Sequence, residues 1–395
     1  MRSFCSLILS LLAGNLAAGQ ATPFRPVTAR FEKFVADGDL SGAVLFVGTK
    51  DKTVYEAAVG QRDLAADAPM TADTLFRIAS MTKPVTALAV MLLADEGKLS
   101  ADDAVEKHLP EFRAQWLVAS REKDALTLKR PARPITLRDL LTHTSGVAAY
   151  PAGLADVYTK RNRTLSETTV AVSQLPLQFE PGTKWSYSNS GIDTLGRVVE
   201  VVSGMSYEAF VQKRILDPLG MADTTFHPTA DQQKRLAVLY RKQDGKLAPA
   251  DGLLALPAHP KHPIPAGGLC STAGDLAKLY RFMLAGGTAD GKRLLSLKSH
   301  ETMTKTQTGD IPTGFVDGMS FGFGWAVVKE PKGVTQTLAA GSYGHGGAFG
   351  TQGWIDPTAG RFFVLLIQRS DIPNGDASSF RAEFQKLAVE AMTKK

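Results

Sequence analysis

The first clear hydrophobic pattern in the chain consists of two short runs that are typical of β-strands. Residues 42–48 read Gly-Ala-Val-Leu-Phe-Val-Gly and residues 53–59 read Thr-Val-Tyr-Glu-Ala-Ala-Val, so both are rich in β-branched and aromatic side chains. Between them lie Lys50, Asp51 and Lys52, a polar stretch of the kind found in tight connections. The pattern therefore predicts a β-hairpin.

A longer apolar segment follows, and its composition indicates a buried helix. From Pro84 to Leu93 the residues are almost continuously apolar, which puts hydrophobic side chains on every face of a helix. Pro84 is tolerated in a first helical turn, because its missing N–H has no intrahelical partner there. We expect a central helix that ends near Gly97.

The rest of the chain divides into a helical stretch and a second set of strands. Between residues 100 and 264 the pattern is helical and rich in loops, and helices are expected at 137–141, 192–202 and 207–216. After residue 265 strand-like runs return, at 324–328, 346–355 and 361–367. The turn from Asp356 to Gly360 joins the last two runs as a hairpin, and Ser379 to Met392 forms a closing amphipathic helix.

Strands at both ends with helices between them predict an α+β fold. We expect an antiparallel sheet formed from both chain ends, with flanking helices and an inserted, mostly helical region. The expected domain covers residues 22–395, with the sheet part at about 22–75 and 265–395 and the helical part at about 76–264. Binding sites favour the junction between such parts, so a cleft is expected there.

The N-terminus has the composition of an export signal. Arg2 supplies a positive charge, the segment from Phe4 to Ala13 is apolar, and small residues continue to Ala21. The apolar run is too short to span a bilayer, so we expect a cleaved signal peptide at residues 1–21 and a periplasmic or extracellular protein without a transmembrane anchor. The mature chain then retains one cysteine, Cys270, and has no intramolecular disulfide.

Composition narrows the classes of partner. The chain has 395 residues, 44% of them hydrophobic, which is enough for a large core. Its formal net charge is +6, and the densest basic stretch is only Lys129, Arg130 and Arg133 among prolines. A nucleic-acid surface needs a concentrated basic stripe, so no nucleic-acid partner is expected. The mild positive bias favours anionic surfaces or substrates.

The candidate chemistry lies at the start of the predicted central helix. Ser80 and Lys83 are one helical turn apart, which brings the amine within reach of the hydroxyl. A serine hydroxyl needs an adjacent base to act as a nucleophile, and burial can lower the pKa of a lysine enough for that task. The alternative is a capping serine with a surface lysine. Ser120 and Lys123 have the same spacing but lie in a polar run, which indicates a solvated loop or helix face.

Other patterns carry less chemistry. Residues 286–293 resemble a phosphate-binding loop but end in Arg293 where a hydroxyl is required, so they are interpreted as a surface turn. His259 and His262 lie among prolines without a nearby carboxylate set, which indicates a polar loop at the rim of the cleft and no metal site. His143 is expected to be a hydrogen-bonded structural residue, and Cys270 a small buried one.

Five motifs in order resemble those of one family of enzymes. They are Ser80-x-x-Lys83, Leu140-Leu-Thr-His-Thr-Ser-Gly146, Pro181-Gly-Thr-Lys-Trp-Ser-Tyr-Ser-Asn189, Ala266-Gly-Gly-Leu-Cys-Ser-Thr272 and His345-Gly-Gly347. The order is similar to that of the superfamily of class C β-lactamases and penicillin-binding proteins, which includes D-alanyl-D-alanine carboxypeptidases, D-aminopeptidases and β-lactamase-like esterases. The resemblance covers about residues 25 to 390 and implies the same sheet-plus-helical fold.

The resemblance implies a role for each motif residue. Ser80 would be the acylated nucleophile, Lys83 its proton partner and Tyr187 the base or a proton relay. Asn189 would be a hydrogen-bonding group in the cleft, and Tyr187-Ser-Asn189 is the one Y-x-N sequence in the chain. The backbone N–H groups of Ser80 and Ala348 would form the oxyanion hole, because Gly346 and Gly347 allow close approach. The alternative for the two glycines is a plain turn.

One departure from the family pattern bears on the substrate. Many members have Lys-Thr-Gly where this chain has His345, Gly346 and Gly347. The lysine helps to hold a substrate carboxylate, whereas a histidine is only partly charged at neutral pH. This difference weakens the case for β-lactams or C-terminal D-alanine peptides. A purely structural role for His345 is the alternative.

These observations together predict an exported hydrolase. We expect it to cleave a small-molecule ester, lactam or peptide through an acyl-enzyme on Ser80, without a metal or organic cofactor, and most readily as a carboxylesterase. A D-amino-acid peptidase or a β-lactamase would use the same site. The hypothesis from another class is a cell-wall-associated penicillin-binding protein that is acylated and does not turn over. The sequence leaves the oligomeric state open.

Overall fold

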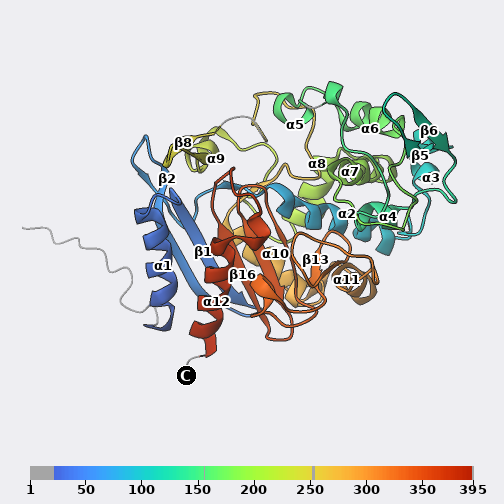
Figure 1. Ribbon diagram of the computed structural model, residues 1–395. Helices are drawn as coiled ribbons and strands as arrows, with labels where there is room; N and C mark the ends of the chain where they lie inside the picture. Colours follow the sequence, from blue (N-terminus) through green and yellow to red (C-terminus); the bar gives the residue numbers. More distant parts are fainter. Residues whose placement is uncertain (1–21, 155, 251–253, 394–395) are drawn as a thin grey trace, which may run out of the picture.

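The computed structural model describes residues 22–154, 156–250 and 254–393, and it contains one large antiparallel sheet (Figure 1). The eight strands follow the order β12-β13-β14-β15-β16-β1-β2-β3. Their bounds are β1 (Gly42–Thr49), β2 (Thr53–Asp63), β3 (Ala68–Pro69), β12 (Met319–Phe321), β13 (Ala326–Val328), β14 (Tyr343–Gly346), β15 (Gln352–Asp356) and β16 (Arg361–Leu366).

The sheet joins the two ends of the chain, as the sequence predicts. In the register of β1 and β16, Val44 pairs with Leu366 and Phe46 with Val364. The predicted N-terminal hairpin is confirmed as β1 and β2, and the predicted hairpin around residues 356–360 is confirmed as β15 and β16.

One predicted strand is wrong. Residues 346–355 do not form a single strand, because the chain reverses between β14 and β15. The turn is closed by two backbone hydrogen bonds: Gly347 N–H donates to Thr351 O (2.7 Å), and Gly350 N–H donates to Gly347 O (3.0 Å). Gly350 has a φ of +81°, a conformation that glycine adopts without strain. The apolar and small residues of the two strands concealed this reversal in the sequence.

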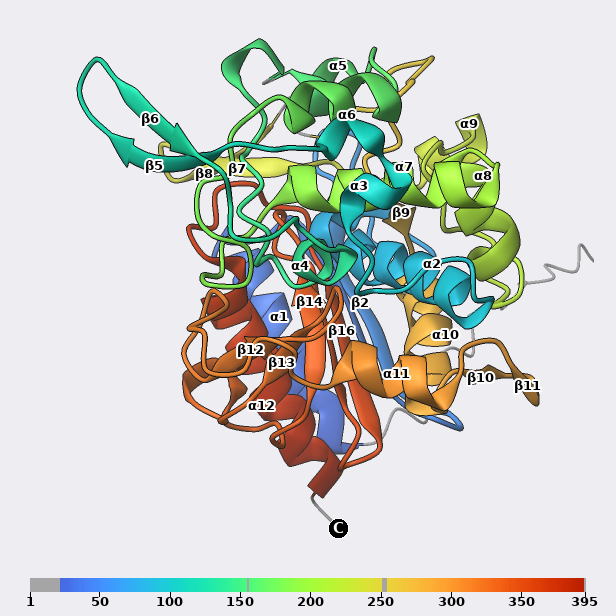
Figure 2. The same ribbon diagram turned by 90° about the vertical axis from the view of Figure 1, so that its right-hand side faces the viewer.

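Helices cover both faces of the sheet (Figures 1 and 2). Side chains alternate across β1, so Ala43, Leu45 and Val47 pack in one cluster and Val44 and Phe46 in another. The first cluster includes α1 (Arg25–Ala36) and α12 (Ser379–Thr393), and the second includes α10 (Ala273–Leu284). Burial on both faces explains why β1 is an almost continuous apolar run. Helix α1 was not predicted from the sequence pattern.

The mostly helical region lies beside the sheet and contains the predicted central helix. This helix is α2 (Lys83–Asp95), whose residues from Lys83 to Leu93 are all buried. It packs against α7 (Asn189–Ser203), which in turn packs against α6 (Leu165–Ser173). The other α-helices are α3 (Val105–His108), α4 (Leu137–Leu141), α5 (Val157–Lys160), α8 (Tyr207–Val211), α9 (Ala230–Lys234) and α11 (Leu297–Thr304).

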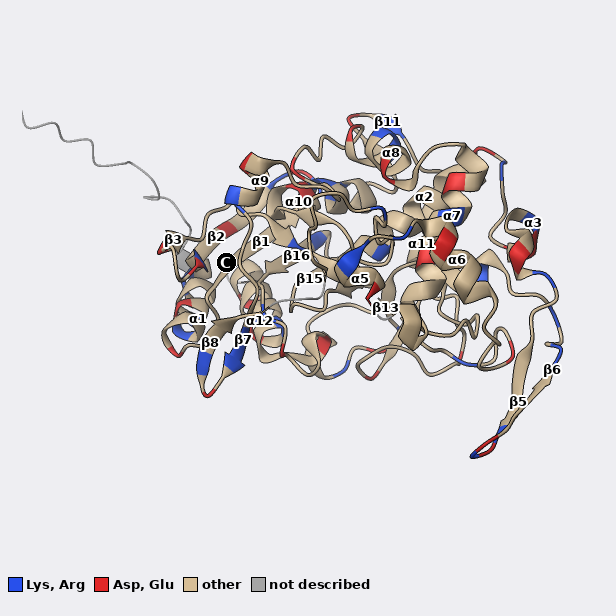
Figure 3. Cartoon of the chain, turned by 90° about the horizontal axis from the view of Figure 1, so that it is seen from above, with Lys and Arg blue, Asp and Glu red and all other residues tan. Residues whose placement is uncertain are grey.

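Four two-stranded ribbons complete the described structure. They are β4 (Phe76–Arg77) with β9 (Cys270–Ser271), β5 (Leu117–Arg121) with β6 (Leu126–Lys129), β7 (Tyr240–Gln243) with β8 (Lys246–Pro249), and β10 (Thr288–Ala289) with β11 (Lys292–Arg293). The β5–β6 hairpin projects from the helical region, with charges of both signs at its tip (Figures 2 and 3). Ser120 lies on β5 and Lys123 in the turn between the strands, and both are exposed. The predicted solvation is therefore confirmed, whereas the predicted loop is right for Lys123 and wrong for Ser120.

The predicted signal peptide lies outside the described residues. Within the described ranges, none of the helices has the length and apolar character needed to cross a membrane. The division at about residues 76 and 264 stays a prediction.

Candidate active site

The segment that carries Ser80 is held in a sharply turned conformation at the end of β4. A 3₁₀ turn (Ala79–Thr82) precedes α2, and Ala79 has a φ of +46° although it is not glycine. A left-handed residue with a Cβ costs roughly 1–2 kcal/mol and persists only where its surroundings hold it. Here Ile78 N–H donates to Leu269 O (3.0 Å) and Met81 N–H donates to Ile78 O (3.1 Å). These backbone hydrogen bonds therefore set the position of Ser80 independently of the contacts that its side chain makes.

Lys83 is completely buried, with 0% of its surface exposed, so the alternative of a surface lysine is wrong. Its Nζ atom donates hydrogen bonds to Ser80 Oγ (3.0 Å), Asn189 Oδ1 (2.8 Å) and Ala266 O (2.7 Å). Burial lowers the pKa of Lys83 from its usual 10.5 to about 7, and the charge of Asp193 opposes that shift. Both the ammonium and the free amine are therefore populated near neutral pH.

The three partners of Lys83 suit both protonation states. Ala266 O and Asn189 Oδ1 can only accept, so two N–H groups remain committed to them. Ser80 Oγ can accept from the ammonium or donate to the free amine. Loss of a proton from Lys83 therefore reverses one hydrogen bond and leaves the other two intact.

Asp193 is a further residue of the site, linked to Lys83 through Ala266, and it was not predicted from the sequence. Its carboxylate is buried and accepts hydrogen bonds from Tyr150 Oη (2.8 Å), Tyr158 Oη (2.6 Å) and the N–H of Ala266 (2.9 Å). It thus helps to position Ala266, the residue whose carbonyl accepts from Lys83. The available signal was an aspartate within the apolar run of α7, one turn after Asn189.

Tyr187 lies over the same amine. Lys83 Nζ is 4.5 Å from the centre of the Tyr187 ring, within the range of a cation–π contact. Burial raises the pKa of the Tyr187 phenol, and an interaction with the Ser80 hydroxyl partly opposes that rise. The phenol is therefore protonated at neutral pH. Of the two candidate bases, Lys83 loses its proton more easily in the resting site.

His345 is neutral rather than partly charged as the sequence analysis expected. It is 4% exposed, and its Nδ1 lies 2.7 Å from Gly346 O, to which it donates. Burial is the main cause that lowers its pKa to about 4, and the charge of Lys83 acts in the same direction. Its Nε2 atom is buried without a hydrogen-bond partner in the described structure. The third motif therefore supplies no fixed positive charge.

Gly346 and Gly347, the glycines of the third motif, let neighbouring side chains pack closely against the end of β14. A Cβ atom on Gly346 would collide with Asp376 Oδ1, and one on Gly347 would collide with Thr351 Oγ1. Packing therefore favours glycine at both positions, although neither has a positive φ. Ala348 follows them and is exposed.

These residues meet in one cleft of about 390 Å³. The predicted members on its wall are Ser80, Tyr187, His345, Gly346, Gly347 and Ala348. Lys83 and Asn189 lie behind Ser80, joined to it by the hydrogen bonds given above. The remaining wall was not predicted: Phe315, Ile372, Pro373, Asn374, Gly375 and Asp376.

Asp376 is the charged group among the unpredicted wall residues. Its Oδ1 accepts from Gln352 Nε2 (3.1 Å) and lies 3.8 Å from Nη1 of Arg381. Arg381 is completely buried over the ring of Trp354, whereas the Asp376 side chain is 19% exposed. The cleft wall therefore carries a carboxylate beside the neutral His345.

Two predictions about other histidines have different outcomes. His143 is a buried structural residue as predicted, with Nδ1 accepting from the N–H of Ser188 (3.2 Å). His262 is not on an exposed rim: it is 0% exposed, Nδ1 accepts from Ile264 N–H (3.0 Å), and Nε2 contacts Thr168 Oγ1 (3.3 Å). In residues 22–154, 156–250 and 254–393, no group of three or more His, Cys, Asp or Glu is arranged to hold a metal ion.

Comparison with known proteins agrees with this fold. The Beta-lactamase family model matches residues 27–388, and the chain belongs to that family. An uncharacterised protein of Mycobacterium tuberculosis is 36% identical over 89% of this chain and 91% of its own length. Esterase EstB of Burkholderia gladioli is 30% identical over 90% and 91%.

A solved structure shows the same architecture. EstCE1, described as a hydrolase with promiscuous acyltransferase activity, superposes with a TM-score of 0.78 at 25% identity, over 93% of this chain and 98% of its own. The fold is therefore the β-lactamase/transpeptidase fold that the motifs predicted, and related proteins with this fold include esterases.

Proposed function

We propose that this protein is a serine hydrolase that cleaves carboxylic esters through an acyl-enzyme on Ser80. The observation that carries the proposal is the hydrogen bond between Ser80 Oγ and a buried lysine whose pKa is about 7. Such an amine can remove the serine proton at neutral pH. The name of one relative, Esterase EstB, supports an ester as the substrate, and EstCE1, described as a hydrolase with acyltransferase activity, supports acyl transfer.

The first half of the reaction forms the acyl-enzyme. Lys83 takes the proton of Ser80 as Oγ bonds to the ester carbonyl carbon, and the backbone N–H groups of Ser80 and Ala348 hold the oxyanion. When the intermediate collapses, the bond from carbon to the alkoxy oxygen breaks. The proton moves from Lys83 through the Tyr187 phenol to that oxygen, and the alcohol leaves.

The second half uses water in place of the alcohol. The oxygen of the water attacks the acyl carbon. At the same time Lys83, again a free amine, takes a proton from this water through Tyr187. The bond to Ser80 Oγ then breaks, Lys83 returns the proton to Oγ, and the carboxylic acid is released. Asn189 keeps the amine in place through both halves by accepting from Nζ.

The charges of the cleft favour substrates without a carboxylate. Asp376 repels an anionic group, and neutral His345 does not attract one. Both features favour uncharged esters over β-lactams and over peptides that end in a free D-alanine carboxylate. The same Asp376 would attract a substrate ammonium group, so an amidase acting on peptides with a free amino terminus is the second candidate.

One set of rates distinguishes the esterase from a β-lactamase, from an amidase and from a penicillin-binding protein that does not turn over. We would measure initial rates of the protein without residues 1–21 on phenyl acetate, a chromogenic cephalosporin and a D-alanine p-nitroanilide, alongside Ser80→Ala. The proposal predicts fast ester hydrolysis that is lost in the variant, with little lactam hydrolysis. Fast lactam turnover would show that the absence of Lys-Thr-Gly does not disfavour lactam substrates. Stoichiometric labelling of Ser80 without turnover would support a penicillin-binding role instead.

We also propose that the protein is exported, on the basis of the charged start, apolar core and small residues of segment 1–21. Expression of the full chain with a C-terminal epitope, followed by cell fractionation, tests this. Recovery of the full-length chain in the cytosol, with the N-terminus intact, would contradict export.

A further inference from the structure

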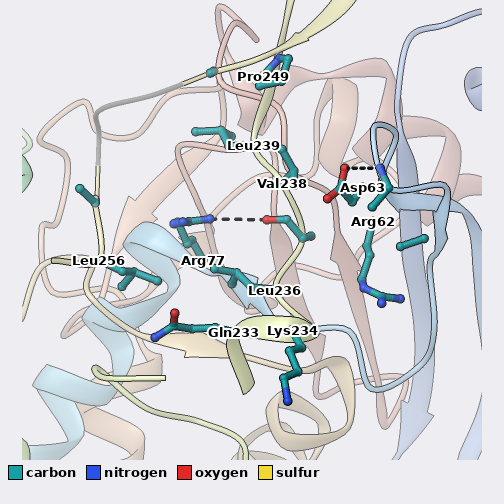
Figure 4. Close-up of a pocket in the computed structure, with 15 residues that line it drawn as sticks. Arg62, Asp63, Arg77, Gln233, Lys234, Leu236, Val238, Leu239, Pro249 and Leu256 are labelled. Carbon is teal, nitrogen blue, oxygen red and sulfur yellow. Dashed lines mark hydrogen bonds between the residues drawn. The ribbon is translucent and has the colours of Figure 1, made fainter. Parts of the chain in front are cut away.

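A second and larger cavity of about 560 Å³ (Figure 4) shares none of the lining residues of the cleft. It is formed where four elements meet: the end of β2, strand β4, helix α9 with the segment that follows it, and the end of β8. Strand β4 links the cavity to the catalytic cleft along the chain, because Arg77 lines the cavity and Ser80, three residues later, lines the cleft.

Arg77 is a cation without a matching anion. Its only hydrogen bond from the guanidinium in the described structure runs from Nη1 to Ala237 O, at a long 3.5 Å (Figure 4). Burial lowers the pKa of Arg77, and the group that opposes this shift is Cys270. The pKa of the Cys270 thiol is itself raised to about 11 by burial, so Cys270 is uncharged at neutral pH. No carboxylate among the described residues forms an ion pair with Arg77.

The other charges around the cavity are mainly positive. Arg62 lines it and donates through Nη1 to Pro69 O (2.7 Å), a neutral partner. Lys234 lines it and pairs with Asp231, whose side chain is exposed. Among the described lining residues the one acidic side chain is that of Asp63, whose Oδ1 already accepts from the N–H groups of its own turn, at Ala65 and Ala66. The described wall of the cavity therefore presents more positive than negative charge to a ligand.

Apart from Gln233, the remainder of the described wall is apolar. Its hydrophobic members are Ala66, Ala68, Leu236, Ala237, Val238, Leu239, Pro249, Ala250, Ala255 and Leu256. A small inorganic anion would leave this surface uncovered. A ligand with one anionic head and a short hydrocarbon body would use both the guanidinium and the apolar wall.

We propose that this cavity is a binding site for small amphiphilic monoanions, namely a carboxylate on a short aliphatic chain. The carboxylate accepts two parallel hydrogen bonds from the guanidinium of Arg77, and the aliphatic chain lies against Leu236, Leu239 and Leu256. The site is separate from the ester-cleaving cleft, and its ligand does not need to react there.

Titration calorimetry with sodium hexanoate tests the site, with hexan-1-ol as the uncharged analogue. Wild-type protein is expected to bind hexanoate saturably and hexan-1-ol at least about tenfold more weakly, because only the carboxylate pairs with the guanidinium. Ser80→Ala, which alters the cleft, is expected to bind hexanoate as the wild type does. These two measurements do not depend on the folding of any variant of the cavity, and neither requires that the protein hydrolyse esters.

Arg77→Gln and Arg113→Gln form a matched pair, since Arg113 is exposed and lines neither site. Arg77→Gln is expected to lose hexanoate affinity by about tenfold or more, and Arg113→Gln to retain it. Circular dichroism establishes that both variants are folded. Equal binding of hexanoate and hexan-1-ol, no saturable hexanoate binding, or an unchanged affinity in folded Arg77→Gln would each overturn the proposal.

Discussion

Lys83 Nζ lies 2.8 Å from Asn189 Oδ1, and this hydrogen bond joins the first residue of α2 to the first residue of α7. The two residues are 106 positions apart in the chain. Their pairing shows how the helical region constructs the site: one helix supplies the amine, and a second helix supplies the acceptor that holds it against Ser80. The same Nζ atom also binds Ala266 O, from the segment that leads back towards the sheet.

The pH dependence of ester hydrolysis is expected to follow the titration of Lys83. Only the free amine can accept the serine proton, so kcat/KM should fall about tenfold per pH unit below pH 7 and level off above it. His345, with a pKa of about 4, should add no step between pH 5.5 and pH 9. The profile of His345→Gln, which is uncharged throughout, provides the control. An acid limb in the wild type that is absent in His345→Gln would assign the titration to the histidine instead.

Asp193 is expected to tune that titration. Its charge raises the pKa of Lys83, so Asp193→Asn should move the acid limb of kcat/KM to lower pH. The amide can still accept from Ala266 N–H, although the pairing with two tyrosine hydroxyls is weakened, so we expect the free energy of unfolding to fall by ~1–3 kcal/mol.

Asp231→Asn is the surface control for Asp193→Asn, because the Asp231 side chain is exposed. It should change neither the profile nor the stability. An acid limb that stays in place or moves to higher pH in folded Asp193→Asn would contradict the electrostatic role of Asp193.

Tyr187→Phe is expected to distinguish proton removal from Ser80 from proton donation to the departing alcohol. Removal of the hydroxyl should lower kcat/KM on an alkyl acetate by ~10²-fold or more, because a departing alkoxide needs a proton. On p-nitrophenyl acetate the loss should be smaller, because p-nitrophenolate leaves without one. Steady-state rates on both esters measure the difference. Equal losses on the two esters would place Tyr187 in the attack step rather than in departure of the alcohol.

Asp376 is expected to discriminate against anionic substrates. In Asp376→Asn, the ratio of kcat/KM for 4-acetoxybenzoate to that for phenyl acetate should rise several-fold, and high salt should reduce the difference from the wild type. Asp371→Asn is the control, because Asp371 is exposed and does not line the cleft. An unchanged ratio in Asp376→Asn would show that the charge of Asp376 does not affect binding or reaction of the substrate.

The sequence predicted those parts of the fold and site that depend on local pattern. The terminal sheet, the buried α2 and the pairing of Ser80 with Lys83 follow from periodicity and spacing within short segments. The reversal between β14 and β15 was missed, because small and apolar residues continue through the turn and two backbone hydrogen bonds decide it.

Electrostatic details depended on tertiary structure. The neutral state of His345 is due to desolvation, which a sequence does not display. Asp193 was not recognised although it interrupts the apolar run of α7, because only the folded chain places it behind Lys83. Asp376 lies in a short 3₁₀ turn before α12, and that segment carries no recognisable motif. The unpaired Arg77 was hidden for the same reason, since only the folded chain shows which carboxylates are near it.

The central claim is that hydrolysis passes through an acyl group on Ser80. The most direct measurement is rapid-quench mass spectrometry of the protein mixed with p-nitrophenyl acetate, with peptide mapping of the product. The account predicts an acetyl group on the peptide that contains Ser80, formed at least as fast as steady-state turnover and absent from Ser80→Ala, which should also lack turnover. Acetylation at another residue, or ester hydrolysis by Ser80→Ala at the wild-type rate, would contradict it.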